Sequence, residues 1–356
     1  MLNKQQSTFF TKTLMHWHTN TNARKMPWKE EKDPYKIWLS EIILQQTRVQ
    51  QGWEYYLRFI KRFPTILKLA KAKQDEVFKL WEGLGYYSRC RNLHFTAQYI
   101  TNNLNGKFPT SYNDIVQLKG VGPYTASAIA SFAFNLPYAV VDGNVNRVLS
   151  RYFGIETAID STEGKKYFTN LAQQLLDKKK PGLYNQAIMD FGATVCKPQL
   201  PLCIECPLQI HCKAYKTSKV LELPVKEKKI VKKNRWFHFF VIKKQDFVFI
   251  KRREAKDIWQ HLYEFVLIER PHKINAEELL ESTAFKAILP SAVKLIAISQ
   301  EYKQQLTHQT IHASFLLLEL TGKKEPIGYE KLPIKELSSI AFPKLLNNYI
   351  KDMAWK

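Results

Sequence analysis

Residues 118–134 read LKGVGPYTASAIASFAF and join a glycine-rich turn to the start of an apolar helix. The glycines allow the backbone to turn tightly, and a new helix begins directly after them. The N-terminus of a helix offers unpaired N–H groups at a positive dipole end, which binds phosphate without reading any base. A Gly-x-Gly turn alone is weak evidence, but here it precedes a helix in a basic chain. We therefore predict that Gly120, Val121 and Gly122 contact phosphate groups.

The region around this turn has the periodicity of helices. From Thr8 to Tyr215 the apolar residues recur mostly at helical spacing, and Gly or Pro stands at the expected helix ends. The pattern predicts one large helical region.

The charge of the chain is strongly positive. There are 54 Lys and Arg against 32 Asp and Glu, a formal net charge of +22. That surplus favours a polyanionic partner, although a soluble protein from a lysine-rich proteome would share it. The N-terminal residues lack the apolar core of a signal peptide, and no apolar run approaches the length of a membrane span. We expect a cytoplasmic monomer with no membrane partner.

Four of the five cysteines lie close together in sequence. Cys196, Cys203, Cys206 and Cys212 have the spacing C-x6-C-x2-C-x5-C. Four thiolates at this density can hold a zinc ion or one iron–sulfur cube, and reduced structural thiols are a third reading. Zinc sites usually present two close pairs on separate knuckles, whereas one CxxC flanked by single cysteines favours a 4Fe-4S cluster. Cys90 is far away in sequence and is expected to be a buried small apolar residue.

Two carboxylates stand in contrasting surroundings. Glu41 lies in IWLSEIILQQTRV, residues 37–49, among the apolar residues of an expected helix. Desolvation there would raise its pKa towards that of a useful general acid. Asp142 lies in AVVDGNVNRVL, residues 139–149, where its local setting favours a helix N-cap. The pair nevertheless has the two functions that glycosidic bond cleavage needs, a proton donor and a negative charge beside the sugar cation.

The texture of the chain changes near residue 230. Residues 217–234, TSKVLELPVKEKKIVKKN, have the composition of a basic linker. RWFHFFVIKK and FVFIKRR follow, separated by Gln245 and Asp246, and predict a β-hairpin. Further strands are expected at 263–269, 293–298 and 313–320, and a helix at 276–287. The domains predicted are a helical domain over residues 1–216, a linker over 217–232 and a small α+β domain over 233–356.

Taken together, these motifs resemble the helix–hairpin–helix glycosylase superfamily with an iron–sulfur cluster, and within it the MutY-type adenine DNA glycosylases. The matching stretches begin with MPWKEEKDPYKIWLSEIILQQTRV and LWEGLGYYSRCRNLH. LKGVGPYTASAIASFAF, AVVDGNVNRVL and NQAIMDFGATVC follow in the order of the family, then the cysteine loop. The resemblance covers residues 20–215. It implies a mainly α fold of two helical subdomains, with a hairpin at 118–125 and an iron–sulfur loop at 196–212, followed by a small α+β Nudix-like domain.

The resemblance also implies a reaction and its residues. Glu41 matches the acid that protonates adenine at N7, Asp142 matches the carboxylate that stabilises the oxocarbenium ion, and Asn144 supports Asp142. Tyr124 lies at the reaction centre. The positions that match the pocket for the extruded base are Arg24, Trp28, Leu44, Tyr124 and Gln186. Those that match the wedge entering the duplex beside the lesion are Gln46, Thr47, Leu84 and Tyr86. Because a stacked base is out of reach, such an enzyme must flip it out.

The implied substrate is double-stranded DNA with adenine opposite 8-oxoguanine or guanine. The enzyme would excise that adenine without lyase activity, and we expect it to be associated with the bacterial nucleoid. Related bifunctional glycosylases carry a lysine nucleophile where this chain has Tyr124, which disfavours a lyase, as does the extra C-terminal domain. Glu41 and Asp142 together disfavour a catalytically silent DNA-binding module. None of the motifs specifies a sliding-clamp or mismatch-repair partner.

The C-terminal domain is expected to read the lesion. It resembles a Nudix-like domain without a complete Nudix box, and it has His261 where many members have Gly. Thr307 and His308 match the segment that detects 8-oxoguanine in the major groove, although a polar turn between two strands is the alternative. His312 is the weaker candidate because it is expected on a strand.

Overall fold

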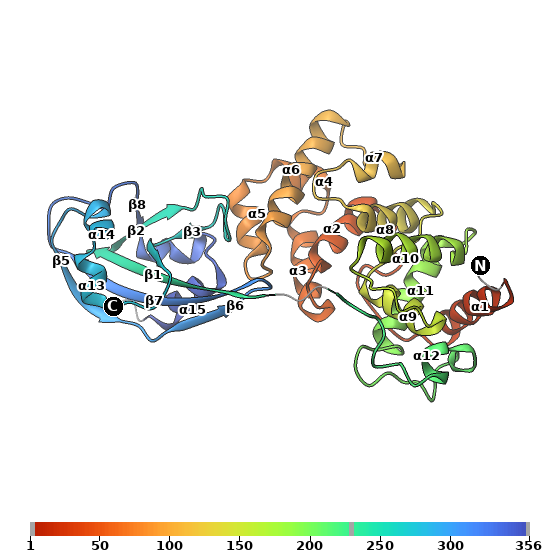
Figure 1. The fold of residues 1–356 in the computed structure, drawn as a ribbon. Coiled ribbons are helices and arrows are strands. Elements are labelled where there is room, and N and C mark those ends of the chain that lie inside the picture. Colours follow the sequence, from red (N-terminus) through yellow and green to blue (C-terminus); the bar gives the residue numbers. More distant parts are fainter. Residues whose placement is uncertain (1–3, 228–230, 354–356) are drawn as a thin grey trace. The chain divides into compact units, whose positions relative to one another are not determined.

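The computed structural model describes residues 4–227 and 231–353. Contacts divide the chain into two units, Met1–Lys71 with Asn92–Lys228, and Ala72–Arg91 with Lys229–Lys356 (Figure 1). The first unit is helical and the second is built on a β-sheet. Within the described residues, no helix has both the length and the apolar character needed to cross a membrane.

The helices of the first unit form two groups. They are α1 (Lys4–Asn20), α2 (Pro34–Leu44), α3 (Val49–Arg62), α4 (Ile66–Lys71), most of α6 (Tyr87–Asn103), α7 (Tyr112–Val116), α8 (Pro123–Phe134), α9 (Gly143–Phe153), α10 (Thr162–Leu175), α11 (Pro181–Thr194), the short 3-10 helix η1 (Gln209–His211) and α12 (Lys213–Lys216). One group surrounds a core built by α1, α9, α10 and α11, including the buried Phe10, Leu149 and Phe191. In the other, α2 packs against α3 and α8, and α8 joins the two groups through α11. The expected pair of helical subdomains is confirmed.

The second unit contains an eight-stranded mixed sheet. Its strands are β1 (Lys233–Lys244), β2 (Phe247–Arg252), β3 (Tyr263–Glu264), β4 (Val266–Arg270), β5 (Val293–Ile298), β6 (Tyr302–Gln305), β7 (Gln309–Leu320) and β8 (Glu330–Pro333). The main path is β3-β2-β1-β7-β5, with β4 paired to β1, β6 to β7 and β8 to β2. Only the β1–β7 pair is parallel among these described pairings.

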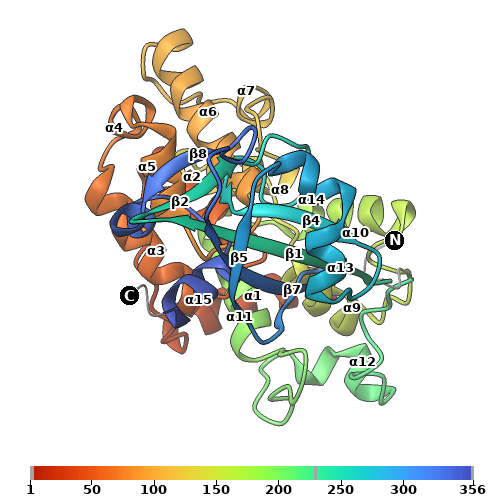
Figure 2. The ribbon, with the colours of Figure 1, turned by 90° about the vertical axis from the view of Figure 1, so that its left-hand side faces the viewer.

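Helices cover both faces of the sheet. The helices of this unit are α5 (Gln74–Trp81), α13 (Ala276–Glu281), α14 (Thr283–Ile288), the 3-10 helix η2 (Ile334–Ser339) and α15 (Lys344–Asp352), and α14 and α15 pack on opposite faces. On one face Phe240 of β1 stacks on Phe285 of α14 at 4.4 Å between ring centroids, and α13 and α14 lie in front of the sheet in Figure 2. On the other, Phe315 of β7 stacks on Tyr349 of α15 at 3.9 Å. Because successive side chains of a strand point to opposite faces, burial on both explains the unbroken run of buried residues in β1, which is apolar apart from His238.

Several expected elements of the second unit differ in detail. The hairpin is confirmed by the pairing of Lys244 with Phe247. The expected helix at 276–287 is two helices, because the Ser282 hydroxyl accepts the Phe285 N–H at 3.2 Å and caps a new helix there. The expected strand at 263–269 is interrupted at Phe265, and the strand β6 escaped prediction.

Residues 72–91, which lie within the predicted helical domain, group by contact with the C-terminal residues. Lys79 Nζ donates to the Ile340 carbonyl at 2.9 Å, and Glu82 accepts from the Phe342 N–H at 3.0 Å and from Asn347 at 2.7 Å. These contacts pair residues more than 250 positions apart, so sequence periodicity carries no sign of them.

The basic linker predicted over 217–232 is described only in part, since residues 228–230 lie outside the described residues. Its first part returns to the first unit, where the Leu223 carbonyl accepts from Arg151 Nε at 3.0 Å and the Val225 carbonyl accepts from the Ile159 N–H at 3.0 Å. The domain limits themselves stay a prediction.

Candidate active site

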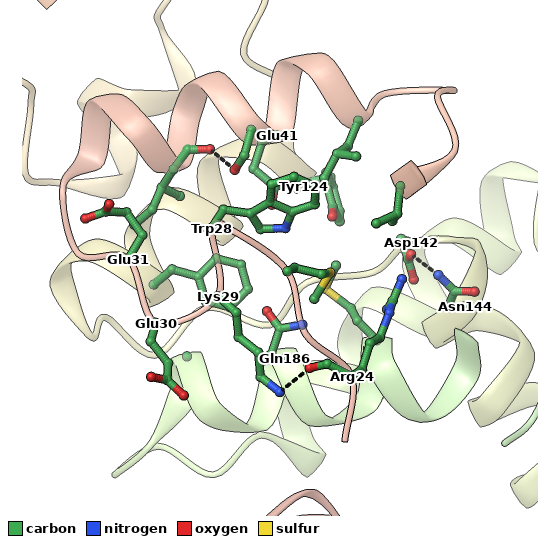
Figure 3. Close-up of a pocket in the computed structure, with 18 of the residues that line it drawn as sticks. Arg24, Trp28, Lys29, Glu30, Glu31, Glu41, Tyr124, Asp142, Asn144 and Gln186 are labelled. Atoms are coloured by element: carbon green, nitrogen blue, oxygen red, sulfur yellow. Dashed lines mark hydrogen bonds between the residues drawn. The ribbon is translucent and has the colours of Figure 1, made fainter. Parts of the chain in front are cut away.

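A pocket of about 600 Å³ opens in the first unit between α2, α8, α9, α11 and the loop that precedes α2 (Figure 3). Glu41, Tyr124, Asp142 and Asn144 all line it. Three chain segments distant in sequence, α2, α8 and the start of α9, therefore bring the predicted reaction-centre residues to one cavity.

Glu41 is placed by α2, a helix that begins at Pro34 behind the N-cap Asp33. Only 6% of the Glu41 surface is exposed to solvent. Burial raises the pKa of the Glu41 carboxyl to about 7, against a smaller lowering by a hydrogen bond from the Tyr124 hydroxyl, and the charge of Asp142 raises it further. A carboxyl with this pKa carries its proton in a large share of molecules at neutral pH, as a general acid requires.

Asp142 is both the expected helix cap and a pocket residue. Its Oδ1 accepts the Val145 N–H at 2.7 Å and so caps α9, while Oδ2 accepts from Asn144 Nδ2 at 2.7 Å. Burial raises the pKa of the Asp142 carboxyl, and the hydrogen bonds from Val145 and Asn144 oppose that rise. The two readings of Asp142 are compatible, because the cap fixes the carboxylate at the pocket wall.

Arg147 connects this carboxylate to the cysteine loop. Its guanidinium donates to Asn144 Oδ1 at 2.8 Å, to the Gly192 carbonyl at 2.7 Å and to the Cys196 carbonyl at 2.8 Å. One buried side chain thus ties the start of α9, the end of α11 and the first cysteine together.

All the residues predicted to hold the extruded base line the pocket. They are Arg24, Trp28, Leu44, Tyr124 and Gln186. Gln46 and Thr47 of the predicted wedge also line it. Gln46 has a positive φ of 56°, a left-handed conformation that a sharp turn after α2 imposes.

Sequence reasoning missed Asp190, whose side chain is fully buried behind the pocket wall. It accepts hydrogen bonds from Asn22, Arg24 and Gln186. Its place one helical turn after Gln186 is the signal that could have identified it.

The remaining predicted wedge and lesion-reading residues belong to the second unit. Leu84 is buried, whereas Tyr86 is 42% exposed, and the Tyr86 hydroxyl is hydrogen bonded to the Thr307 hydroxyl. Two residues predicted separately for the lesion side therefore meet within one unit. His308 is exposed, and its carbonyl accepts the Lys233 N–H at 3.0 Å.

His312 lies on β7 as expected, stacked on Trp236 at 4.9 Å and paired with Glu301 at 2.8 Å. These contacts hold it within the sheet. His261, where many members have Gly, has a φ of 70°, so the backbone there keeps a glycine-like conformation.

The glycine-rich turn has the expected geometry. Gly120 has a φ of 83°, and a Cβ there would come within 2.7 Å of the Asn92 Cβ. Gly122 is the N-cap of α8 and makes no side-chain capping bond. The Val121 N–H is used inside the turn, donating to the Leu118 carbonyl at 3.0 Å, so any phosphate contact at Val121 must involve another atom. The phosphate role of the turn stays a prediction.

The four clustered cysteines are free thiols in the described structure. Burial raises the pKa of the Cys206 thiol to about 12, and the neighbouring charges of Cys196, Cys212 and Cys203 raise it further against a hydrogen bond from Leu208. Within the described ranges, no three His, Cys, Asp or Glu side chains already stand in a metal-binding arrangement. Four cysteine sulfurs lie in one loop, close enough for their charges to influence one another. This set of donor atoms fits an iron–sulfur cluster.

Comparisons with known proteins identify the family of the chain. Residues 39–177 match the HhH-GPD superfamily of base excision DNA repair proteins, and residues 238–352 match a NUDIX domain. An adenine DNA glycosylase of Buchnera aphidicola subsp. Baizongia pistaciae (strain Bp) is 36% identical over 309 residues, covering 85% of this chain and 84% of that protein. The chain belongs to the adenine DNA glycosylases. The expected resemblance and fold are confirmed, including the Nudix-like C-terminal domain.

Other members and structures extend the comparison. The adenine DNA glycosylase of Mus musculus is 46% identical over 217 residues, covering 58% of this chain and 42% of that one. The solved structure of a thermostable thymine-DNA glycosylase has a TM-score of 0.56 at 30% identity, covering 60% of this chain and 98% of its own. This adenine DNA glycosylase is thus a base-excision repair hydrolase.

Proposed function

We propose that this glycosylase removes adenine paired with 8-oxoguanine or guanine in double-stranded DNA. The observation that carries the proposal is a buried carboxyl with a pKa of about 7, Glu41, in the same pocket as a second carboxylate, Asp142. Two carboxyl groups with separate environments supply the acid and the electrostatic partner that glycosidic cleavage needs.

The proposed reaction begins when adenine is flipped out of the duplex into the pocket. Glu41 gives its proton to N7, which makes the base a better leaving group as the C1′–N9 bond breaks and its electron pair moves to the base. The sugar becomes an oxocarbenium ion, and the Asp142 carboxylate, oriented by Asn144, offsets its positive charge. Water then attacks C1′, and its proton returns to the Glu41 carboxylate.

A monofunctional reaction is supported by the positions of the lysines. Lys29 and Lys32 are the lysines that line the pocket, and each is engaged, Lys29 with the Arg24 carbonyl at 3.0 Å and Lys32 with the Phe132 carbonyl at 3.2 Å. Lys119 lies over the Phe95 ring at 4.3 Å and does not line the pocket. No described lysine is thus presented as an amine nucleophile in this pocket.

We propose that Cys196, Cys203, Cys206 and Cys212 hold a 4Fe-4S cluster. The bound cluster would supply a rigid centre for the loop, and Arg151, which donates to Cys196 Sγ at 3.5 Å and to the Lys197 carbonyl at 2.7 Å, would fix that loop against α9.

Lesion preference is proposed for Tyr86, Thr307 and His308. The hydrogen bond between the Tyr86 and Thr307 hydroxyls supports this. It would couple the Thr307 hydroxyl in the major groove to the Tyr86 ring at the base stack, so that the two side chains respond to the lesion together. Tyr86→Phe removes only the hydroxyl. It should reduce the rate ratio for adenine opposite 8-oxoguanine over adenine opposite guanine, as should Ala at both Thr307 and His308. An unchanged ratio in both variants would transfer lesion sensing to Gln46 and Thr47.

One assay tests the main proposal. Duplexes with adenine opposite 8-oxoguanine, adenine opposite guanine, and thymine glycol are incubated with the protein and analysed with and without alkali. Strand breaks at adenine only after alkali are expected. Breakage without alkali would indicate a lyase, and the absence of any excision would reject the enzyme assignment.

A further inference from the structure

Asp190 has no function in the proposed reaction. It belongs to α11, its side chain has no exposed surface, and it does not itself line the pocket. A buried carboxylate is costly unless it is paired and hydrogen bonded. What surrounds Asp190 therefore indicates why a charge is kept in this place.

Its partners are pocket residues and the loop that carries them. Oδ1 accepts from Arg24 Nη1 at 2.7 Å and from Gln186 Nε2 at 3.0 Å. Oδ2 accepts from Asn22 Nδ2 at 2.8 Å and faces Lys29 Nζ at 3.8 Å. Figure 3 shows Arg24 and Gln186 projecting into the same pocket as Glu41.

The bond to Gln186 fixes which end of its amide faces Asp190. A carboxylate between two cations is an acceptor only, so the NH₂ end of Gln186 must turn towards it. The amide is planar, with its oxygen on the side opposite that bond. Since Gln186 lines the pocket and Asp190 does not, the carbonyl oxygen is the end left for a base.

We propose that Asp190 is a positioning residue that selects a purine with an amino group at C6, by holding the Gln186 carbonyl towards the pocket. This rests on the proposed excision of adenine. The adenine amino group donates to that oxygen, whereas the keto oxygen of hypoxanthine would face it as a second acceptor and be repelled. Both bases offer the same N7 to Glu41, so they differ at the edge that Gln186 reads.

The test compares single-turnover excision of adenine and of hypoxanthine opposite 8-oxoguanine. In Asp190→Ser, the hydroxyl both donates and accepts, so the Gln186 amide is held in neither orientation. The ratio of adenine to hypoxanthine rates should fall by about tenfold, the value of one mismatched buried hydrogen bond. Asp177→Ser, the same substitution at a position outside the pocket, should leave the ratio unchanged.

A double mutant separates positioning from general support. In a Gln186→Ala background, Asp190→Ser should change the ratio no further, because the amide through which it acts is gone. An unchanged ratio in Asp190→Ser, whether or not both rates fall, would overturn the proposal. An effect on the ratio that persists without Gln186 would overturn it as well.

A second variant covers the case in which Asp190→Ser fails to fold. Gln186→Glu leaves Asp190 in place, and the two adjacent carboxyls share a proton, so an oxygen still faces the base. It should keep the preference for adenine, and a loss of that preference would overturn the proposal, because an acceptor oxygen would then not be what selects the amino group. The wild type decides the underlying function, since failure to excise adenine would reject the proposed function rather than the role of Asp190.

Discussion

Replacing Glu41 by Gln should abolish excision and, at alkaline pH, stabilise the fold. The rate effect follows from the proton that the amide cannot deliver. With a pKa of about 7, about half of the Glu41 carboxyls are protonated at neutral pH, whereas a carboxyl at 4.5 would be protonated in about 0.3% of molecules. Burial therefore increases the proton-bearing form about 150-fold, and general acid catalysis of this kind contributes about 10²–10⁴ in rate.

The stability effect has the same origin. The pKa of Glu41 is higher in the folded chain than in the unfolded one, so between pH 4.5 and about 7 the folded state binds more protons. Stability from this group is thus complete at acid pH and is lost as pH rises through that window. The full loss corresponds to about 3 kcal/mol. Glutamine has no charge to bury and avoids this cost.

The assay combines single-turnover excision with urea unfolding at pH 5 and pH 8. Wild-type excision should decline as pH rises above about 7, and the stability advantage of Glu41→Gln should be larger at pH 8 than at pH 5. Duplex binding by the variant serves as the control and should be largely unchanged. Near-normal excision by Glu41→Gln, or a stability difference that ignores pH, would refute the reasoning.

Three further predictions concern Asp142, the cysteine loop and the binding of the duplex. Asp142→Asn should lose excision about as severely as Glu41→Gln while keeping its melting temperature, because an amide oxygen still caps α9 at Val145 but no charge faces the sugar; single-turnover rates and thermal melts check this. Anaerobically purified protein should be yellow-brown with about four irons per chain, and Cys203→Ser should lower both folding stability and DNA affinity; zinc in elemental analysis would contradict the cluster. Duplex binding should weaken steeply with salt, measured as the dissociation constant from 50 to 200 mM, and a flat dependence would exclude an extensive phosphate footprint.

The helical unit was predictable because its signals are local. The composition of the glycine turn before α8 predicts that turn, and the apolar neighbours of Glu41 in sequence already indicate that its carboxyl is desolvated. Asp142 shows the limit, since the sequence offered a cap or a catalytic group as alternatives, and only the structure shows that the capping residue also lines the pocket, which makes the two compatible. Asp190 was missed because its partners Asn22 and Arg24 come from a loop more than 160 positions away, and only Gln186 lies near it in sequence.

The C-terminal unit was predictable in outline only. Strand alternation and turn residues identified the β1–β2 hairpin, but the parallel pairing of β1 with β7 joins segments that no local pattern relates. The single helix expected at 276–287 breaks at Ser282 because a side-chain hydroxyl competes with the helical backbone.

The grouping of residues 72–91 with the C-terminal residues changes how this enzyme can be dissected. Glu82 accepts bonds from Phe342 and Asn347, Phe78 stacks edge-on against His261 at 6.4 Å, and Tyr86 is bonded to Thr307. A chain cut after Leu223 would therefore lose the residues proposed to read the lesion, and it would also lose the contacts that hold the segment carrying Tyr86. A change in the selectivity of that truncated chain would combine two separate losses. Single-atom changes such as Tyr86→Phe can therefore assign the function, whereas the truncation cannot.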